Sequence, residues 1–399
     1  MPRPNDTQPL HSAGIVMSTV VYLAGKSMDF AADLDVRLAE AISEFVHVLW
    51  VEPATDGVDA PSNRSRIERI TPTLSRLSVS SPACPSRRLS RHLARRRQDV
   101  AISEALEELG ATSSAVVLAD PTGSFPQSIG GHQLYYITDD WVSGAAKYGV
   151  KRRAVRAAVE RNCRAADTVA AVSHTLALRL HLYSKTIDAV RVVPPGCIVD
   201  PTVHVHVHQR DQAAASPIAL SGPLDEGLDY DILDAVALTG IHIVATGTKH
   251  TTNAATANRV ESFLSRPNVH WLDEPSGPAT NRHLSAAAVG IAPFVVDAFN
   301  RARFPAQPLD YLASGLAVVT TDLPATRWLD SEHVAIAQSP REFAEKVSEH
   351  VAAEKNSALS TTRREAASKH SWTVRATTML RLMALYSDAA ARANSETIR

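Results

Sequence analysis

The feature that most constrains this chain is a regular alternation of short apolar runs with longer amphipathic stretches. The apolar runs are continuous and do not alternate with polar residues, which is typical of parallel strands buried on both faces. The expected strands are Val20–Leu23, Val46–Val51, Ala115–Leu118, Gln133–Ile137, Thr168–Val172, Ile218–Ser221, Ile241–Ala245, Val269–Leu272, Val289–Pro293 and Ala317–Thr320. The expected helices are Phe30–Glu44, Ser86–Leu109, Lys151–Ala165, Asp229–Leu238, Ala255–Leu264, Pro308–Ser314, Arg341–Ala353 and Ser371 to about Ala391. Such an alternation predicts right-handed βαβ units and doubly wound α/β sheets.

A polar, alanine-rich stretch at residues 201–217 has little helical pattern and predicts a break between two α/β halves. Two Rossmann-like halves would place a ligand site in the cleft between the carboxyl ends of their strands. The expected segments are a disordered tail at 1–16, an N-terminal domain at 17–198, a linker at 199–215, a C-terminal domain at 216–370, and a helix within 371–399 that packs back on the N-terminal domain.

The composition excludes several classes of protein. Hydrophobic residues make up 45% of the 399 residues and charged residues 21%, which is typical of folded cores and not of disorder. Lys and Arg number 41 against 42 Asp and Glu, so no overall charge points to a nucleic-acid partner. The three cysteines form no CxxC pair, and no apolar run reaches the roughly 20 residues of a membrane span. We therefore expect a cytoplasmic protein without a signal peptide.

The first strand ends in a run that resembles part of a phosphate-binding loop. Ala24-Gly25-Lys26-Ser27 matches the end of that motif, but Val20 stands where the motif requires glycine. We therefore expect a tight βα turn at the cleft. The residues expected on its acceptor side are Gly25, Lys26 and Asp29.

Three histidines, His204, His206 and His208, share one face of an extended segment within the linker. This spacing fits either a shared metal ion or a solvated linker strand. The run itself contains no acidic or cysteine ligand, so we expect no metal site.

Two carboxylates follow the predicted strand Gln133–Ile137, at Asp139 and Asp140, with Trp141 next to them. Parallel α/β sheets bind ligands at the carboxyl ends of their strands, so one carboxylate could deprotonate an acceptor hydroxyl while the other raises its pKa. Equally, either aspartate could simply cap the next helix. Trp141 is expected beside the acceptor.

The segment from Phe294 to Pro324 carries the strongest functional signal. A strand ends at Pro293, and the loop that follows contains Asn300, Arg301 and Arg303. A helix is predicted to begin near Phe304-Pro305, where free N–H groups and the two arginines could meet a phosphate. Asp310 in this helix could accept two hydrogen bonds from a ribose diol.

This segment resembles the donor-binding signature of GT-B glycosyltransferases of the group 1, family-4-like type, approximately N…PxKxxEYLAxGxPVVxTDLP. Ser221-Gly222-Pro223-Leu224 and Asn268–Leu272 look like other strand ends of the same donor domain. The run Ile137–Trp141 resembles the teichuronic-acid and exopolysaccharide branch. The resemblance covers the chain from Val20 to about Tyr386.

The resemblance implies a GT-B fold, with two Rossmann-like domains facing a cleft and a C-terminal crossover helix. It implies transfer of a sugar from a nucleotide-diphosphate sugar to a glycan, lipid-linked or small-molecule acceptor, without metal or cofactor. Asp310 would hold the ribose. The other residues expected on the donor side are Gly247, Lys249, Asn300, Arg301, Arg303, Pro305 and Gln307. Asp139 or Asp140 would be the base of an inverting displacement; a retaining enzyme would use them for acceptor positioning.

The chain departs from the family pattern in four ways, and two of them, at Gln307 and Ala302, motivate an alternative: a degenerate GT-B subunit that binds a nucleotide or a partner protein without turnover. Asp310 replaces the usual ribose-binding Glu, and Gln307 replaces a Lys. Ala302 stands where an earlier Glu is expected, and no Arg-Lys pair follows Gly222.

Basic residues cluster locally in the N-terminal half. Six arginines and no acidic residue lie within Arg87–Arg97, and seven basic residues lie within Lys147–Arg164 against Glu160 alone. Two interpretations fit: solvated helical faces, or contact with an anionic membrane on its inner face.

Overall fold

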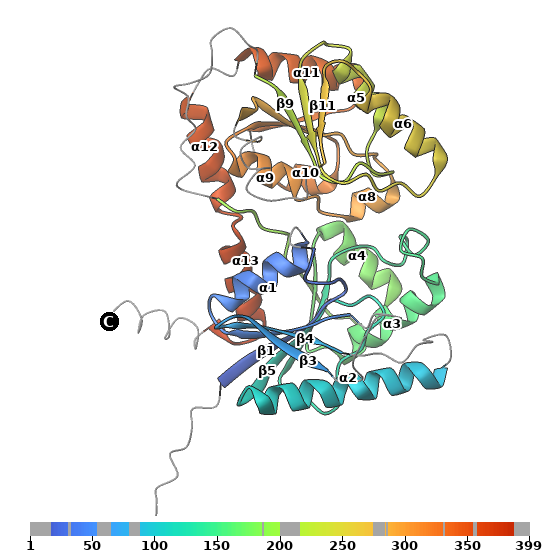
Figure 1. Cartoon of the computed structure of the whole chain (residues 1–399), viewed down its shortest axis with the longest axis vertical. Coiled ribbons are helices and arrows are strands. Elements are labelled where there is room, and N and C mark those ends of the chain that lie inside the picture. Colours follow the sequence, from blue (N-terminus) through green and yellow to red (C-terminus); the bar gives the residue numbers. More distant parts are fainter. Residues whose placement is uncertain are drawn as a thin grey trace, which may run out of the picture.

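The computed structural model describes residues 17–30, 33–53, 65–79, 88–185, 187–199, 216–273, 284, 286–329, 332–353 and 357–386. Two α/β domains lie one above the other, the N-terminal domain in blue to green and the C-terminal domain in yellow to red (Figure 1). The expected tail at 1–16, nearly all of the linker and its three histidines, and Arg87 lie outside the described residues. No helix among the described residues is long and apolar enough to cross a membrane.

The N-terminal domain is built on a sheet in the order β3-β4-β2-β1-β5-β6-β7-β8. All neighbouring strands are parallel except β3 and β4. The strands are β1 (Met17–Leu23), β2 (His47–Val51), β3 (Arg66–Thr71), β4 (Leu74–Ser78), β5 (Ala111–Leu118), β6 (His132–Ile137), β7 (Thr168–Ala171) and β8 (Val190–Val192). The helices are α1 (Leu34–Ser43), α2 (Arg88–Glu108), α3 (Arg152–Ala165) and α4 (His174–Tyr183).

The described part of the C-terminal domain contains a parallel sheet in the order β11-β10-β9-β12-β13-β14. Its strands are β9 (Ile218–Ser221), β10 (Ile243–Thr246), β11 (Val269–Leu272), β12 (Val289–Ala292), β13 (Ala317–Thr321) and β14 (Val334–Ala337). The helices are α5 (Tyr230–Ala237), α6 (Ala254–Leu264), α8 (Ala298–Ala302), α9 (Gln307–Ala313), α10 (Pro324–Trp328), α11 (Pro340–Ala353), α12 (Ser357–Ser368) and α13 (Trp372–Leu382). The strand order reverses between β9 and β12, which is where such sheets bind ligands.

Burial explains why the apolar runs form central strands. β2 is buried along its whole length, and Trp50 in it stacks on Tyr22 of β1 with ring centroids 5.3 Å apart. The helix expected from Phe30 begins instead at Leu34, because the Asp33 side chain accepts a hydrogen bond from the Asp35 N–H and caps it.

The last helix returns to the N-terminal domain. α13 packs against α1, and the backbone of Ser371 pairs with Cys197 (Figure 1). Within α13 the buried Arg375 donates from Nε to the Pro195 carbonyl, 3.2 Å away, at the end of the N-terminal domain. α13 ends at Leu382, short of the expected end near Ala391, and residues beyond 386 are not described.

Candidate active site between the two domains

Two glycines at strand ends mark the donor side of the cleft. Gly222 follows β9 with φ +112°, and Gly247 follows β10 with φ +126°. A Cβ atom on Gly247 would lie 2.2 Å from the Gly222 carbonyl oxygen, and one on Gly222 would lie 2.5 Å from Nε2 of Gln307. Only glycine fits this close approach. The predicted donor residues Gly247 and Gln307 therefore lie together with Gly222.

Asp310 is partly exposed on α9, and its carboxylate makes no hydrogen bond or ion pair with a described residue. Burial raises the pKa of Asp310 to about 7, while Arg37 of the N-terminal domain pulls it down. Arg37 lies on α1, so the Asp310 carboxylate is close enough to the opposite domain to sense its charge. An unpaired carboxylate in this position can accept hydrogen bonds from a diol.

The predicted donor-side cations have different surroundings. Nζ of Lys249 lies 4.1 Å from the Trp271 ring centroid and 2.9 Å from Oε1 of Glu261. Arg301 is exposed, and its charge adds to the lowering of the pKa of Asp322, which a hydrogen bond from Arg327 dominates. These two cations are therefore directed toward partners within their own domain.

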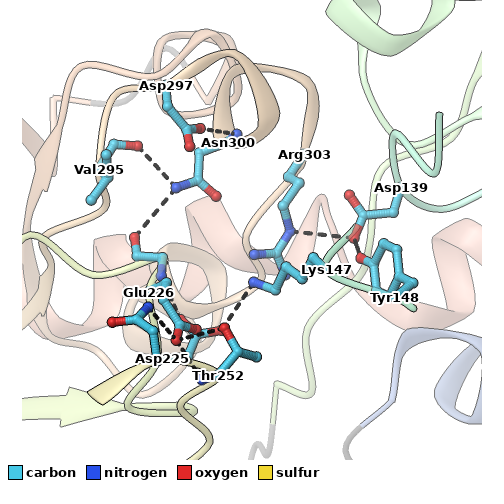
Figure 2. A network of polar contacts seen from close by, with 12 residues as sticks. Asp139, Lys147, Tyr148, Asp225, Glu226, Thr252, Val295, Asp297, Asn300 and Arg303 are labelled. Carbon is cyan, nitrogen blue, oxygen red and sulfur yellow. Dashed lines mark hydrogen bonds and ion pairs between the residues drawn. The ribbon is translucent and has the colours of Figure 1, made fainter. Parts of the chain in front are cut away.

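Arg303 instead reaches across the cleft. Its Nε lies 3.5 Å from Oδ2 of Asp139 in the N-terminal domain (Figure 2). The Tyr148 hydroxyl donates to the same oxygen. Asp139 therefore lies at the cleft between a cation and a phenol, with 13% of its side chain exposed.

Asn300 corrects one expectation. Its side chain is buried, and its amide donates to the carbonyls of Val295 at 2.9 Å and Gly227 at 3.3 Å (Figure 2). The residue anchors the loop before α8 and does not face a diphosphate. Pro305, also expected on the donor side, is buried as well.

Asp140 is a second correction. Its side chain has no exposed surface, and its carboxylate accepts from Arg179 Nη1 at 2.5 Å and from the Tyr183 hydroxyl at 3.1 Å. Burial alone would raise the pKa of Asp140, but hydrogen bonds from Ser143 and Arg179 outweigh it and hold the pKa below its usual value. An enclosed, ion-paired carboxylate is unsuited to accept a proton from a substrate. Of the two predicted bases, only Asp139 is accessible.

The residues expected on the acceptor side also differ in their surroundings. A Cβ on Gly25 would lie 2.9 Å from the Ala119 carbonyl oxygen, which confirms a tight turn. Lys26 is exposed and pairs with Asp33 at 2.6 Å, and the exposed Asp29 pairs with Arg76 at 2.8 Å.

Trp141 corrects a further expectation. It is 6% exposed and belongs to the hydrophobic core, so it does not present its ring to an acceptor.

Several contacts across the cleft had no signal in the sequence. Lys147 pairs with Asp225 of the other domain at 3.1 Å, and Ser173 Oγ donates to the Ala302 carbonyl at 2.6 Å. Phe299 of α8 packs on Gly144, where a Cβ would lie 2.6 Å from the ring. The partners in each contact are more than 70 residues apart, so no local pattern could reveal them.

Among the described residues, no group of three or more His, Cys, Asp or Glu side chains could hold a metal ion. The basic side chains of α2 and α3 with described surroundings are mostly exposed: Arg95, Arg96, Arg97, Arg152, Arg153, Arg156 and Arg164. Arg161 is the exception, because it donates to the Gly123 carbonyl at 2.6 Å.

No protein-family model and no curated protein sequence matches this chain. Solved structures do match it over nearly its whole length. A UDP-forming α,α-trehalose-phosphate synthase from Burkholderia xenovorans aligns with a TM-score of 0.63 and 10% identity, covering 94% of this chain and 100% of that one. HepE from Anabaena, solved with UDP and glucose, aligns with a TM-score of 0.62 and 12% identity, covering 92% of this chain and 99% of that one.

WaaG, a glycosyltransferase involved in lipopolysaccharide biosynthesis, aligns with a TM-score of 0.58 and 13% identity, covering 92% of this chain and 99% of that one. These structures are GT-B glycosyltransferases, and the predicted GT-B fold is thereby confirmed. The narrower resemblance to the teichuronic-acid and exopolysaccharide branch stays a prediction.

We expect Asp140→Asn to destabilise the fold by about 1–3 kcal/mol at pH 7, because it leaves Arg179 without its ion-pair partner. The pKa of Asp140 is lowered by folding, so its contribution is present above the pKa of the unfolded chain and is lost as the pH falls through the folded pKa. Urea unfolding at several pH values should therefore show a difference from wild type that shrinks below about pH 4. Asp188→Asn, at an exposed site, is the matched control. Equal stability of Asp140→Asn and wild type at pH 7 would contradict this assignment.

Proposed function

We propose that this chain is a glycosyltransferase that moves a sugar from a nucleotide-diphosphate sugar to an acceptor hydroxyl. The observation that carries the proposal is Asp310: an unpaired carboxylate in the C-terminal domain, at the cleft and on the helix that begins beside Gly222 and Gly247. The fold shared with GT-B glycosyltransferases supports the same function. The C-terminal domain would hold the nucleotide, and the N-terminal domain would hold the acceptor.

On the donor side, Asp310 would accept hydrogen bonds from the two ribose hydroxyls. The glycine pair lets the donor approach the backbone at the ends of β9 and β10. Gln307 would donate its amide to the diphosphate or sugar, and Arg303 would supply positive charge. With side chains supplying this charge, the proposed reaction requires no metal ion or other cofactor.

On the acceptor side, Asp139 is the proposed base of an inverting displacement. Tyr148 and Arg303 both contact its carboxylate, and Lys26 lies close enough for their charges to interact. If the reaction retains configuration instead, Asp139 positions the acceptor hydroxyl and takes no proton. The acceptor class we propose is a glycan, a lipid-linked sugar or a small molecule.

A second candidate, a degenerate subunit without turnover, is favoured by one observation. Ala302, at the position of the family's earlier Glu, is fully buried, and its carbonyl accepts from Ser173 of the other domain. A carboxylate therefore has no room to face the donor from this position. Such a subunit would bind a nucleotide or a partner protein but would not hydrolyse or transfer the sugar of any nucleotide sugar.

We expect wild-type protein to bind one of a panel of UDP-, GDP- and ADP-linked sugars by calorimetry, and Asp310→Asn to weaken that binding at least tenfold. The ionised carboxylate is the acceptor of the ribose hydrogen bonds. Because its pKa lies at about 7 in the free protein, affinity should rise between pH 6 and pH 8. Nucleotide sugars suit this test because their diphosphate does not titrate near pH 7.

Asp231→Asn on the exposed surface of α5 is the control for this experiment. In Asp310→Asn the pH dependence should disappear together with the affinity. If no nucleotide sugar binds to the wild-type protein, the enzyme proposal is wrong. If binding occurs without sugar hydrolysis or transfer, the degenerate subunit is the better description.

We expect Asp139→Asn to keep donor affinity within about threefold while lowering transfer at least 100-fold, because general base catalysis contributes roughly 10²–10⁴. Donor binding by calorimetry and transfer by release of the nucleoside diphosphate separate the two effects. Transfer at the wild-type rate would remove Asp139 from the mechanism.

We also propose that the N-terminal domain contacts an anionic membrane on its inner face, which keeps the protein cytoplasmic but peripherally bound. The exposed arginines of α2 and α3 support this contact. Each basic residue near an anionic surface contributes about 1 kcal/mol. The solvated-face interpretation predicts no such binding.

Co-sedimentation with vesicles tests the membrane contact. The wild-type protein should bind vesicles containing anionic lipid at low salt and dissociate from them at high salt. It should not co-sediment with zwitterionic vesicles. Replacing Arg152, Arg153 and Arg156 by Gln should weaken binding more than tenfold, at about 1 kcal/mol per residue. Arg341→Gln, an exposed arginine in the other domain, should leave binding unchanged. Binding of the triple variant as tight as that of wild type would rule out α3 as the contact.

A further inference from the structure

Two cations cross the cleft in opposite directions. Lys147 of the N-terminal domain pairs with Asp225 of the C-terminal domain at 3.1 Å. Arg303 of the C-terminal domain lies 3.5 Å from Asp139 of the N-terminal domain. Figure 2 shows both side chains extending into the space between the domains.

The ring of Phe299 holds the two cations near each other. Nζ of Lys147 lies 5.3 Å from the ring centroid, and Cζ of Arg303 lies 5.5 Å from the same centroid. The ring in turn lies against Gly144, where no Cβ would fit. Two positive groups gathered on one aromatic ring repel each other, so an anion placed between them would be stabilised by both.

Both ion pairs are open to exchange. The side chain of Lys147 is 30% exposed and that of Arg303 is 36% exposed. Their carboxylate partners, Asp225 and Asp139, are 12% and 13% exposed, but each cation keeps exposed surface at which a ligand carrying two negative charges can compete for it.

Lys147 and Arg303 are connected to the proposed donor site through neighbouring segments of the C-terminal domain. Asp225 belongs to the loop after β9 that begins at Gly222, and this loop runs beside the loop that starts at Gly247. Arg303 lies just before α9, whose first residue, Gln307, contacts Gly222. Each cation is therefore connected to the loops where the donor is proposed to bind, Lys147 through Asp225 and Arg303 through the chain before α9.

The donor domain has few alternatives for binding a diphosphate. Gln307 carries no charge, and no arginine or lysine lies within the turn from Gly222 to Asp225. The other cations near these strand ends are Lys249, which pairs with Glu261 through side chains that are 33% and 66% exposed, and Arg301, whose charge acts on Asp322; both interact with partners in their own domain.

We propose that Lys147 of the N-terminal domain, together with Arg303 of the C-terminal domain, holds the diphosphate of the donor. This inference rests on the proposed function and deepens it, because it makes the donor site complete only when both domains contribute. Lys147 would then be a donor-binding residue located outside the donor domain. Asp225 is the partner that it leaves or shares when the diphosphate arrives.

Calorimetry on the full chain tests this with two probes, inorganic pyrophosphate and the panel of UDP-, GDP- and ADP-linked sugars. Lys147→Met should weaken both probes about tenfold or more, since it removes a charge-assisted contact. Lys147→Arg should restore most of the affinity, because it keeps the charge. Lys151→Met, an exposed lysine at the start of α3, should change neither probe.

Asp225→Asn separates anion binding from simple domain closure. This variant removes the ion pair with Lys147 but keeps the cation and the oxygen that accepts from the Gly227 N–H at 2.7 Å. If Lys147 binds the diphosphate, Asp225→Asn should bind both probes at least as tightly as wild type. If Lys147 only fastens the domains together, Asp225→Asn should weaken binding as much as Lys147→Met, and the proposal is overturned.

The remaining outcomes of this experiment also test the inference. Unchanged binding of both probes by Lys147→Met overturns the inference while leaving the proposed function intact. Binding of pyrophosphate that depends on Lys147, without binding of any nucleotide sugar, contradicts the proposed function and with it the role of Lys147 in holding a donor diphosphate. Binding of neither probe by the wild-type protein overturns both. A thermal melt of each variant confirms that it is folded before these comparisons are made.

Discussion

The arrangement of this cleft depends on one guanidinium group. Arg179 of α4 donates Nη1 to the buried carboxylate of Asp140, 2.5 Å away, and Nη2 to the Ala298 carbonyl of the other domain, 2.7 Å away. A buried carboxylate fixes the arginine, and the arginine fixes the start of α8. Phe299 lies in this helix and Arg303 is its C-cap residue, so their positions at the N-terminal domain depend on the same contact.

The second connection between the two domains is made by α13. Arg375 of α13 donates to the Pro195 carbonyl, and its Nη2 lies 2.9 Å from Nδ1 of His370. α13 is thus attached to the N-terminal domain although it follows the C-terminal domain in the chain (Figure 1). The two domains are thus connected at α13 and again at α8, and the candidate site lies between these connections.

The two candidate functional carboxylates, Asp310 and Asp139, have different electrostatic surroundings. Asp310 has no partner among the described residues, and burial raises its pKa to about 7. Such a carboxyl group is available to a ligand that donates hydrogen bonds. The carboxylate of Asp139 accepts a hydrogen bond from Tyr148 and lies near Arg303. If Arg303 turns to the diphosphate, Asp139 loses its cationic neighbour, so donor binding and the availability of the base are coupled through one side chain.

The strands that the sequence predicted are largely buried, with β11 as the exception. Each expected apolar run corresponds to a strand, because continuous burial leaves a strong pattern. β3 was missed because it is polar and largely exposed on a sheet edge, and β4 was missed because its sequence is not a continuous apolar run although most of it is buried. β8 and β14 were missed because they are short and only partly buried. The helices α4, α8, α10 and α12 were also missed. α8 and α10 have only five residues each, and α4 follows its strand after a serine cap without a long apolar periodicity.

The sequence by itself determined the α/β class, the two halves and the donor segment, because these depend on local periodicity and on residues that are neighbours in the chain. It also placed Gly247, Gln307 and Asp310 among the candidates for one site. Only the tertiary structure decided which candidates face the cleft. Asp140, Trp141 and Asn300 turned out to be buried supports, and Lys147 turned out to be a cleft residue. The physical reason is that exposure and ion pairing at a cleft depend on the opposite domain, whose residues lie far away in the sequence.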